Sequence, residues 1–148
     1  MIVCDTSAIV ALIDADDAHH SAMVDLFDDD PAACVLPWAI LPEVDYLVSR
    51  HISARVAESF LADVLQGAFA VEWGDEEDLR RAQEIRAQYA GLALGLVDSV
   101  VAAIAERLNA RAIATLDLRD FGALELSGRP LLFPRDLRRK ARRTAPIR

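Results

Sequence analysis

The chain has 148 residues and a mass of 16.2 kDa, which suits a single domain with a core of its own. With 53% hydrophobic and 27% charged residues, its composition excludes a disordered or low-complexity protein. Two cysteines are too few for a disulfide-rich secreted scaffold, and no apolar run reaches the ~18–20 residues of a membrane span. The first five residues lack a basic region, so we expect no signal peptide and a cytoplasmic protein.

Charge is distributed unevenly along the chain, whose formal net charge is −8. Residues 1–134 contain nine basic and 23 acidic residues, whereas residues 135–148 contain seven basic residues and one acid. Such an acidic body would by itself repel the phosphates of nucleic acid. The basic tail, residues 135–148, is either a solvated end without function or a source of attraction for nucleic acid. We therefore expect one domain over residues 1–134, followed by the tail.

The predicted elements alternate between short apolar strands and longer helices. In chain order we expect a strand at 2–4, helices at 7–14 and 19–27, a strand at 34–36, a helix ending near Arg50, a helix from Ser53 to near Gly67, a strand at 69–71, helices at 75–89 and 97–108, and strands at 112–115 and 131–133. The helix at 97–108 has the clearest pattern, with one apolar face made of Val97, Val100, Val101, Ile104, Ala105 and Leu108. Strands separated by helices need crossover connections, so the sequence predicts an α/β fold with a mostly parallel sheet.

Acidic residues lie at the ends of two predicted strands and in the first turns of two predicted helices. Asp5 and Asp117 follow strands, Asp120 comes three residues after Asp117, and Glu43 and Asp98 open helices. Each acid alone is explained as a helix cap or a turn residue. Ligands of parallel α/β sheets, however, bind beyond the carboxyl ends of the strands, where these carboxylates would converge. Clustered carboxylates either raise their pKa values or recruit a cation.

Ligands that are all oxygen suit Mg²⁺ or Mn²⁺ rather than zinc. Divalent ions held by carboxylates position a water and stabilise the leaving oxygen of a phosphodiester. This chemistry also accounts for the acidic body, because the acids attract metal ions and the metal ions attract phosphate.

Four short segments carry these acids: residues 2–8 (IVCDTSA), 42–47 (PEVDYL), 96–102 (LVDSVVA) and 114–121 (ATLDLRDF). In this order and at this spacing they resemble the four motifs of PIN domains, and specifically of the VapC-type toxin ribonucleases of bacterial toxin–antitoxin pairs. The resemblance extends from residue 1 to about residue 134. It implies a three-layer α/β/α sandwich around a mostly parallel central sheet.

The resemblance also implies an activity and a set of site residues. Asp5, Glu43, Asp98 and Asp117 would bind Mg²⁺ or Mn²⁺ and act as the catalytic acids. A metal-activated water would then hydrolyse RNA endonucleolytically, in tRNA or rRNA. A homodimer and a cognate VapB-type antitoxin are the partners that the resemblance implies.

Further residues have roles that the resemblance leaves less defined. Thr6 and Thr115 match hydroxyl positions that would orient the carboxylates. Close relatives often carry His where this chain has Asp120, which is either an additional metal ligand or a turn residue. Arg50 and Arg119 are candidate RNA contacts. Because Pro42 directly precedes Glu43, the start of that helix is left open.

Two alternatives stay open within the same fold: a PIN nuclease that processes RNA without being a toxin, and a PIN-like module that binds RNA or protein without cutting. Other folds that gather acids above a parallel sheet fit less well. A response-regulator receiver uses a lysine at its site, and the only lysine here is Lys140, in the basic tail. A phosphatase of the haloacid-dehalogenase type has a second acid two residues after the first, where this chain has Ser7.

Overall fold

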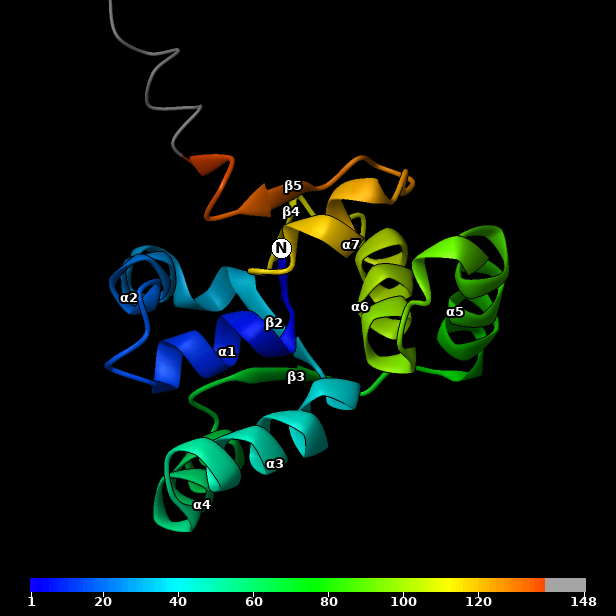
Figure 1. Cartoon of the computed structure of the whole chain (residues 1–148). Helices are drawn as coiled ribbons and strands as arrows, with labels where there is room; N and C mark the ends of the chain where they lie inside the picture. The colour runs from blue at the N-terminus through cyan, green and yellow to red at the C-terminus, as the bar shows by residue number, and fades with distance from the viewer. Residues whose placement is uncertain (138–148) are drawn as a thin grey trace, which may run out of the picture.

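The computed structural model describes residues 1–137 and contains a parallel sheet of five strands (Figure 1). The strands are β1 (Ile2–Cys4), β2 (Cys34–Pro37), β3 (Ala70–Glu72), β4 (Ala112–Ala114) and β5 (Leu131–Phe133), in the order β3-β2-β1-β4-β5. β1 therefore lies in the centre, between β2 and β4. The sequence prediction of a parallel α/β sheet is confirmed, and each predicted strand lies within one or two residues of an observed one.

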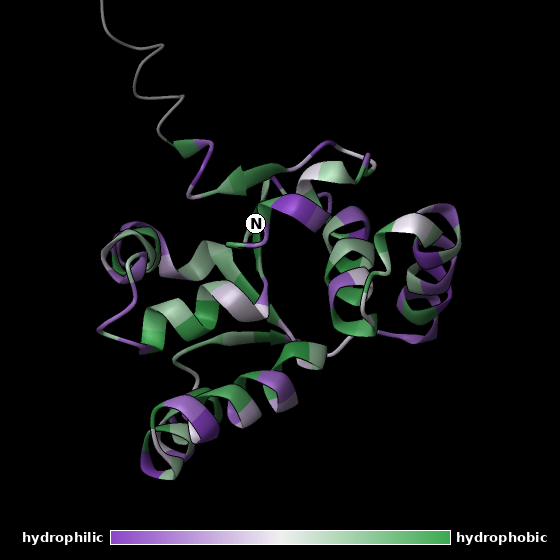
Figure 2. Ribbon diagram, viewed as in Figure 1, coloured by the Kyte–Doolittle hydropathy of each residue, from purple (hydrophilic) through white to green (hydrophobic). Residues whose placement is uncertain are grey.

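The three inner strands are short and apolar because both of their faces are covered. Every residue of β1, β2 and β4 is buried, whereas β3 and β5, at the two edges, each begin with an exposed residue. Strands buried on both faces read as continuous apolar runs instead of alternating patterns. Figure 2 shows the resulting separation, with hydrophobic residues on the strands and hydrophilic ones on the outer turns of the helices.

Helices cover both faces of the sheet, which gives three layers (Figure 1). On one side, α1 (Thr6–Ile13) packs against α2 (His20–Asp29) and α3 (Leu41–His51), and α3 packs against α4 (Ala54–Leu65). On the other side, α5 (Glu76–Gln88) packs against α6 (Leu96–Arg107), and α6 contacts β1 and β2. A short helix, α7 (Leu118–Ala123), contacts β5. Three single turns of 3₁₀ helix are η1 (Pro31–Ala33), η2 (Trp38–Ile40) and η3 (Ala90–Leu92).

Helix α6 is buried on a wider arc than its sequence pattern predicts. Val101, Ile104 and Ala105 of the predicted face are buried, but so are Ala102 and Ala103, while Val97, Val100 and Leu108 are only partly buried. The reason is that α6 lies between the sheet and α5, so two of its sides are covered. The small residues Ala102, Ala103 and Ala105 allow this close approach.

Other local predictions hold or need adjustment. Ser53 caps α4 as predicted, since its Oγ accepts a 3.1 Å hydrogen bond from the Val56 amide. Helix α7 was not predicted. Asp136, two residues beyond the predicted domain boundary, is buried, and its Oδ2 accepts a 2.8 Å hydrogen bond from the Leu132 amide. Most of the basic tail, residues 138–148, lies outside the described residues. Within residues 1–137, no helix is long and apolar enough to cross a membrane.

Candidate active site

The centre of the site is Asp5, which directly follows the central strand β1. Its amide donates a 2.9 Å hydrogen bond to the Ala114 carbonyl and so extends the ladder between β1 and β4. Asp5 as a whole is only 3% exposed. Oδ2 accepts two hydrogen bonds of 2.9 Å, one from the Ser7 hydroxyl and one from the Thr115 hydroxyl. Oδ1 is buried and has no hydrogen-bond partner among the described residues.

The two hydroxyls that bind Asp5 also fix the loop after β4. The Thr115 Oγ1 accepts a 3.0 Å hydrogen bond from the Asp117 amide, and the Ser7 Oγ accepts one of 2.9 Å from the Leu116 amide. Thr115 thus links two of the predicted acids, Asp5 through its hydroxyl proton and Asp117 through its oxygen. This arrangement sets both the orientation of the Asp5 carboxylate and the path of the chain into Asp117.

Ser7 makes the contact to Asp5 that the sequence analysis assigned to Thr6. The Thr6 hydroxyl is buried without a hydrogen-bond partner among residues 1–137, so it does not orient a carboxylate there. The contact to Asp5 comes from Ser7 instead, which the sequence prediction missed. The reason is geometric: Asp5 precedes the first residue of α1, and the hydroxyl two residues further on turns back toward it. The Asp-Thr-Ser run was visible, but hydroxyls at helix starts usually serve as caps.

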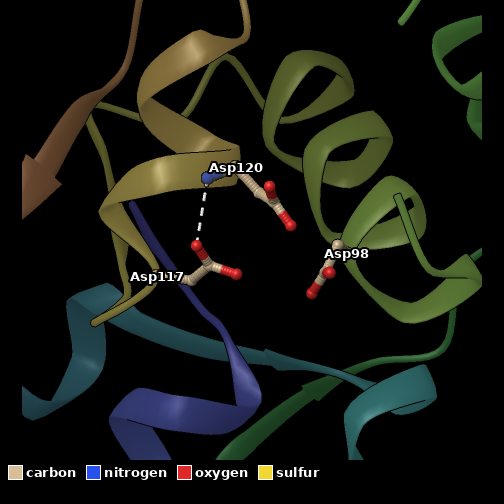
Figure 3. A group of neighbouring side chains, drawn as sticks. All are labelled: Asp98, Asp117 and Asp120. Atoms are coloured by element: carbon tan, nitrogen blue, oxygen red, sulfur yellow. Dashed lines mark hydrogen bonds between the residues drawn. The ribbon is translucent and has the colours of Figure 1, made fainter. Parts of the chain in front are cut away.

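Three carboxylates converge at the same edge of the sheet: Asp98 from the first turn of α6, Asp117 from the loop after β4, and Asp120 from α7 (Figure 3). One oxygen from each lies within 4.8 Å of the others. Asp117 Oδ1 accepts a 3.0 Å hydrogen bond from the Asp120 amide and so caps α7, which leaves its second oxygen for the cluster. Asp120 Oδ1 is buried and has no hydrogen-bond partner among the described residues. Asp120 thus lies in the first turn of α7 and places its carboxylate in the cluster, a position from which it could serve as the additional metal ligand.

Glu43 faces the cluster from a different helix. It lies in the first turn of α3, which begins at Leu41, so the proline before it is accommodated where helices tolerate it. Neither Glu43 nor Asp5 is among the residues whose oxygens lie within 4.8 Å of one another. Their charges nevertheless act on that group, because both raise the pKa of Asp98. The structure thus brings the four predicted acids and Asp120 to one edge of the sheet, with Asp98, Asp117 and Asp120 closest together.

Burial and like charges make this site costly to ionise. The pKa of Asp98 is raised to about 7, first by its burial and then by the charges of Asp5, Asp117, Glu43 and Asp120. The pKa of Asp5 is also raised, mainly by burial, although the hydrogen bonds from Thr115 and Ser7 oppose the rise. A cluster whose carboxylates repel one another at neutral pH is stabilised by a cation placed among them.

The donor set fits a hard divalent cation. All the candidate ligand atoms are carboxylate oxygens, which Mg²⁺ and Mn²⁺ prefer, and two of them, Asp5 Oδ1 and Asp120 Oδ1, are buried without a hydrogen bond inside residues 1–137. Buried oxygens without partners are rare in proteins and call for an explanation such as an ion. Metal coordination would satisfy both atoms and offset the repulsion.

The two arginines proposed as RNA contacts lie at different distances from this cluster. Arg119 is exposed on α7, between Asp117 and Asp120. Arg50 is exposed in the last turn of α3, seven residues from Glu43, which is roughly 10 Å along the helix axis. Arg119 is therefore close in the chain to two of the clustered acids, whereas Arg50 lies two turns of α3 away from Glu43.

Fold and carboxylates together define a PIN domain, and the sequence pattern of that family matches residues 2–125. The chain belongs to the PIN domain family. It is 29% identical over 127 residues to Ribonuclease VapC26 of Mycobacterium tuberculosis (strain ATCC 25618 / H37Rv). The matched region covers 86% of this chain and 94% of that protein.

Solved structures have the same fold. One is VapC20 of Mycobacterium tuberculosis, described as a toxin that cleaves the sarcin-ricin loop. It superposes with a TM-score of 0.76 at 24% identity, and the superposition covers 86% of this chain and 98% of the VapC20 chain. DNA-bound VapBC from Salmonella typhimurium gives a TM-score of 0.68 at 17% identity and covers 88% of this chain and 95% of its own.

Proposed function

We propose that this protein is a Mg²⁺- or Mn²⁺-dependent endoribonuclease that acts in the cytoplasm as the toxin of a toxin–antitoxin pair. The observation that carries the proposal is the convergence of Asp98, Asp117 and Asp120 beside the buried carboxylate of Asp5. Membership of the PIN family and the likeness to Ribonuclease VapC26 support the reaction type. Hydrolysis of an RNA phosphodiester in tRNA or rRNA is the reaction that these observations favour.

In this proposal Asp5, Glu43, Asp98 and Asp117 hold the cation, and Asp120 is an additional ligand. A divalent cation at such a site supplies positive charge that activates a water and stabilises the leaving oxygen. The chain's own part is to fix the carboxylates in place. Thr115 and Ser7 hold Asp5 in one orientation, and the cap that Asp117 forms on α7 sets the position of Asp120.

A VapB-type antitoxin is the partner that we propose. Two structures of similar fold, from Salmonella typhimurium and Rickettsia felis, are VapBC complexes bound to DNA. We also propose a homodimer, which sedimentation of the purified protein tests directly. Two alternatives exist within the fold. A short neighbouring antitoxin gene distinguishes a toxin from an RNA-processing nuclease, and a cleavage assay distinguishes a nuclease from a module that binds without cutting.

The decisive experiment incubates purified, antitoxin-free protein with total RNA and either Mg²⁺, Mn²⁺ or EDTA, and maps the new 5′ ends. We expect discrete cuts with metal that vanish with EDTA and with Asp98→Asn, whose fold is checked by circular dichroism. Asp63→Asn, on the exposed side of α4, is the matched control and should cut like the wild type. Folded wild-type protein that makes no metal-dependent cut would overturn the nuclease proposal and favour binding alone. Cuts that survive Asp98→Asn would overturn the site.

A further inference from the structure

Two exposed tryptophans stack on each other beside the carboxylate site. The rings of Trp38 and Trp73 have their centroids 5.9 Å apart and their planes 26° from parallel. Their exposed fractions are 49% and 67%, so the core does not explain them. They are the only two tryptophans of the chain. We call them the indole pair.

The parallel sheet places the indole pair at the same edge as the acids. Each tryptophan directly follows a strand, Trp38 after β2 and Trp73 after β3, and the register pairs the last residues of those strands, Pro37 and Glu72. All five strands run parallel, so their carboxyl ends lie along one edge, which Asp5 and Asp117 share.

The indole pair also lies close to that site. Continuing the register of β1 and β2 puts Pro37 beside Asp5, so the backbones of Trp38 and Asp5 lie within roughly 10 Å. Trp38 belongs to η2, which packs against α6, the helix of Asp98, and against α3, the helix of Glu43. The indole pair therefore flanks the carboxylates on the β2–β3 side.

We propose that the indole pair binds an unpaired base of the RNA, next to the bond that is cut, by stacking; this rests on the ribonuclease function proposed above. Single-stranded nucleic acid is commonly held by aromatic side chains on which bases stack, because every base has a flat π face. A metal-filled acid cluster attracts the phosphate, while the neutral indoles take up the base without adding charge. A base would extend the existing stack by one ring.

The surroundings of the indole pair fit a base better than a second protein surface. Two indoles exposed to this degree offer on the order of 200–300 Å², whereas a stable protein interface takes about 800 Å² from each partner. The residues beside Trp73 in the chain are Glu72, Gly74 and Asp75, none of which is apolar. Glu72 forms an ion pair with Arg107 at 2.9 Å, which reduces its repulsion of an RNA strand, although Arg107 is shared with Asp78.

Tryptophan fluorescence tests the stacking, because the whole signal of the chain comes from this pair. Asp98→Asn protein in Mg²⁺ is titrated with oligouridylate, and with an abasic ribose-phosphate chain of the same length and charge. We expect quenching by the first and none by the second. Equal quenching by both would overturn the proposal, because phosphate alone would then be the cause.

Cleavage kinetics separate this inference from the nuclease function. Trp73→Ala in the wild-type background should raise KM for single-stranded RNA roughly 10- to 100-fold and change kcat much less, and Trp73→Phe should restore most of the affinity. Leu65→Ala, an equally exposed apolar residue at the far end of α4, is the control and should match wild type. Wild-type cleavage with unchanged KM in Trp73→Ala would overturn stacking but leave the nuclease intact. Sedimentation of Trp73→Ala tests a second reading of the indole pair. If this variant loses a dimer that the wild type forms, and oligouridylate still quenches the remaining tryptophan, the indole pair would instead be a contact between two copies of the chain.

Discussion

The hydroxyl of Thr115, directly after β4, donates a 2.9 Å hydrogen bond to Oδ2 of Asp5, directly after β1. Asp5 and Thr115 are 110 residues apart in the chain, yet the pairing of β1 with β4 makes them neighbours. Through this bond the orientation of a buried carboxylate depends on the strand beside it.

Removing the Thr115 hydroxyl should therefore lower the stability of the protein and disturb the geometry of the site. Thr115→Val leaves Asp5 Oδ2 with one donor and the Asp117 amide without its acceptor, at an expected loss of about 1–3 kcal/mol in the free energy of unfolding. Thr6→Val is the matched comparison, since the Thr6 hydroxyl is equally buried but has no hydrogen-bond partner within residues 1–137, and it should be neutral or stabilising. Urea unfolding of both variants measures the difference. Equal destabilisation would show that Thr6 has the supporting role that the sequence suggested.

The stability of the metal-free protein should fall as the pH rises. Because the pKa of Asp98 is raised from 3.8 to about 7, its contribution to stability is fully present below about pH 4 and is lost as the pH rises through 7. Thermal unfolding in EDTA between about pH 5 and about pH 8 should show this decline. Asp98→Asn should make the loss of stability with rising pH smaller, because only the contribution of the raised pKa of Asp5 remains. Identical slopes for wild type and Asp98→Asn would contradict the assignment.

Asp120 should bind metal through its side chain, independently of its place in α7. Its backbone amide, which bonds to Asp117, is retained in Asp120→Asn, so this change alters only the carboxylate. We expect Mn²⁺ affinity, measured by calorimetry, to fall roughly tenfold or more. Asp45→Asn, at an exposed carboxylate of α3, should leave the affinity unchanged. An unaltered affinity in Asp120→Asn would make Asp120 a turn residue only.

Ion pairs made by arginines on α5 and α6 should differ sharply in their effect on stability, depending on how buried the paired carboxylate is. Arg107 contacts both oxygens of the buried Asp78, at 2.7 and 2.9 Å, and also Glu72. Arg107→Ala leaves that buried carboxylate without its cation, so we expect a loss of about 3 kcal/mol. Arg80→Ala breaks only exposed pairs with Glu76 and Glu77 and should change stability by less than about 0.5 kcal/mol. Similar losses in both variants, by thermal unfolding, would contradict this reasoning.

The acids of the site were predictable because each lies next to a strand or a helix that the local sequence pattern indicates. Asp5 and Asp117 come directly after apolar runs, and Glu43 and Asp98 open helices, so a parallel sheet was enough to bring them to one edge. The order of the strands was not needed for this step, since all carboxyl ends of a parallel sheet lie on the same side.

What sequence did not predict depends on register between distant segments. The contact of Trp38 with Trp73 requires that β2 and β3 be neighbours and that Pro37 face Glu72, which no local pattern states. Which hydroxyl donates to Asp5, that of Thr6 or that of Ser7, depends on the backbone dihedral angles just after β1, which no local pattern states. The wider burial of α6 depends on which helix covers its outer side, and the charged pattern of α5 gave no sign that it would do so.

The central position of β1 has a consequence for how the protein is made. Chains emerge from the ribosome N-terminus first, so β1 appears well before its partner β4, which begins only at Ala112. Until then Asp5 lacks the Thr115 hydroxyl, and the group of Asp98, Asp117 and Asp120 is incomplete. The nascent protein therefore carries no assembled carboxylate cluster until α7 has been made, and any chain that stops before α7 is left without one.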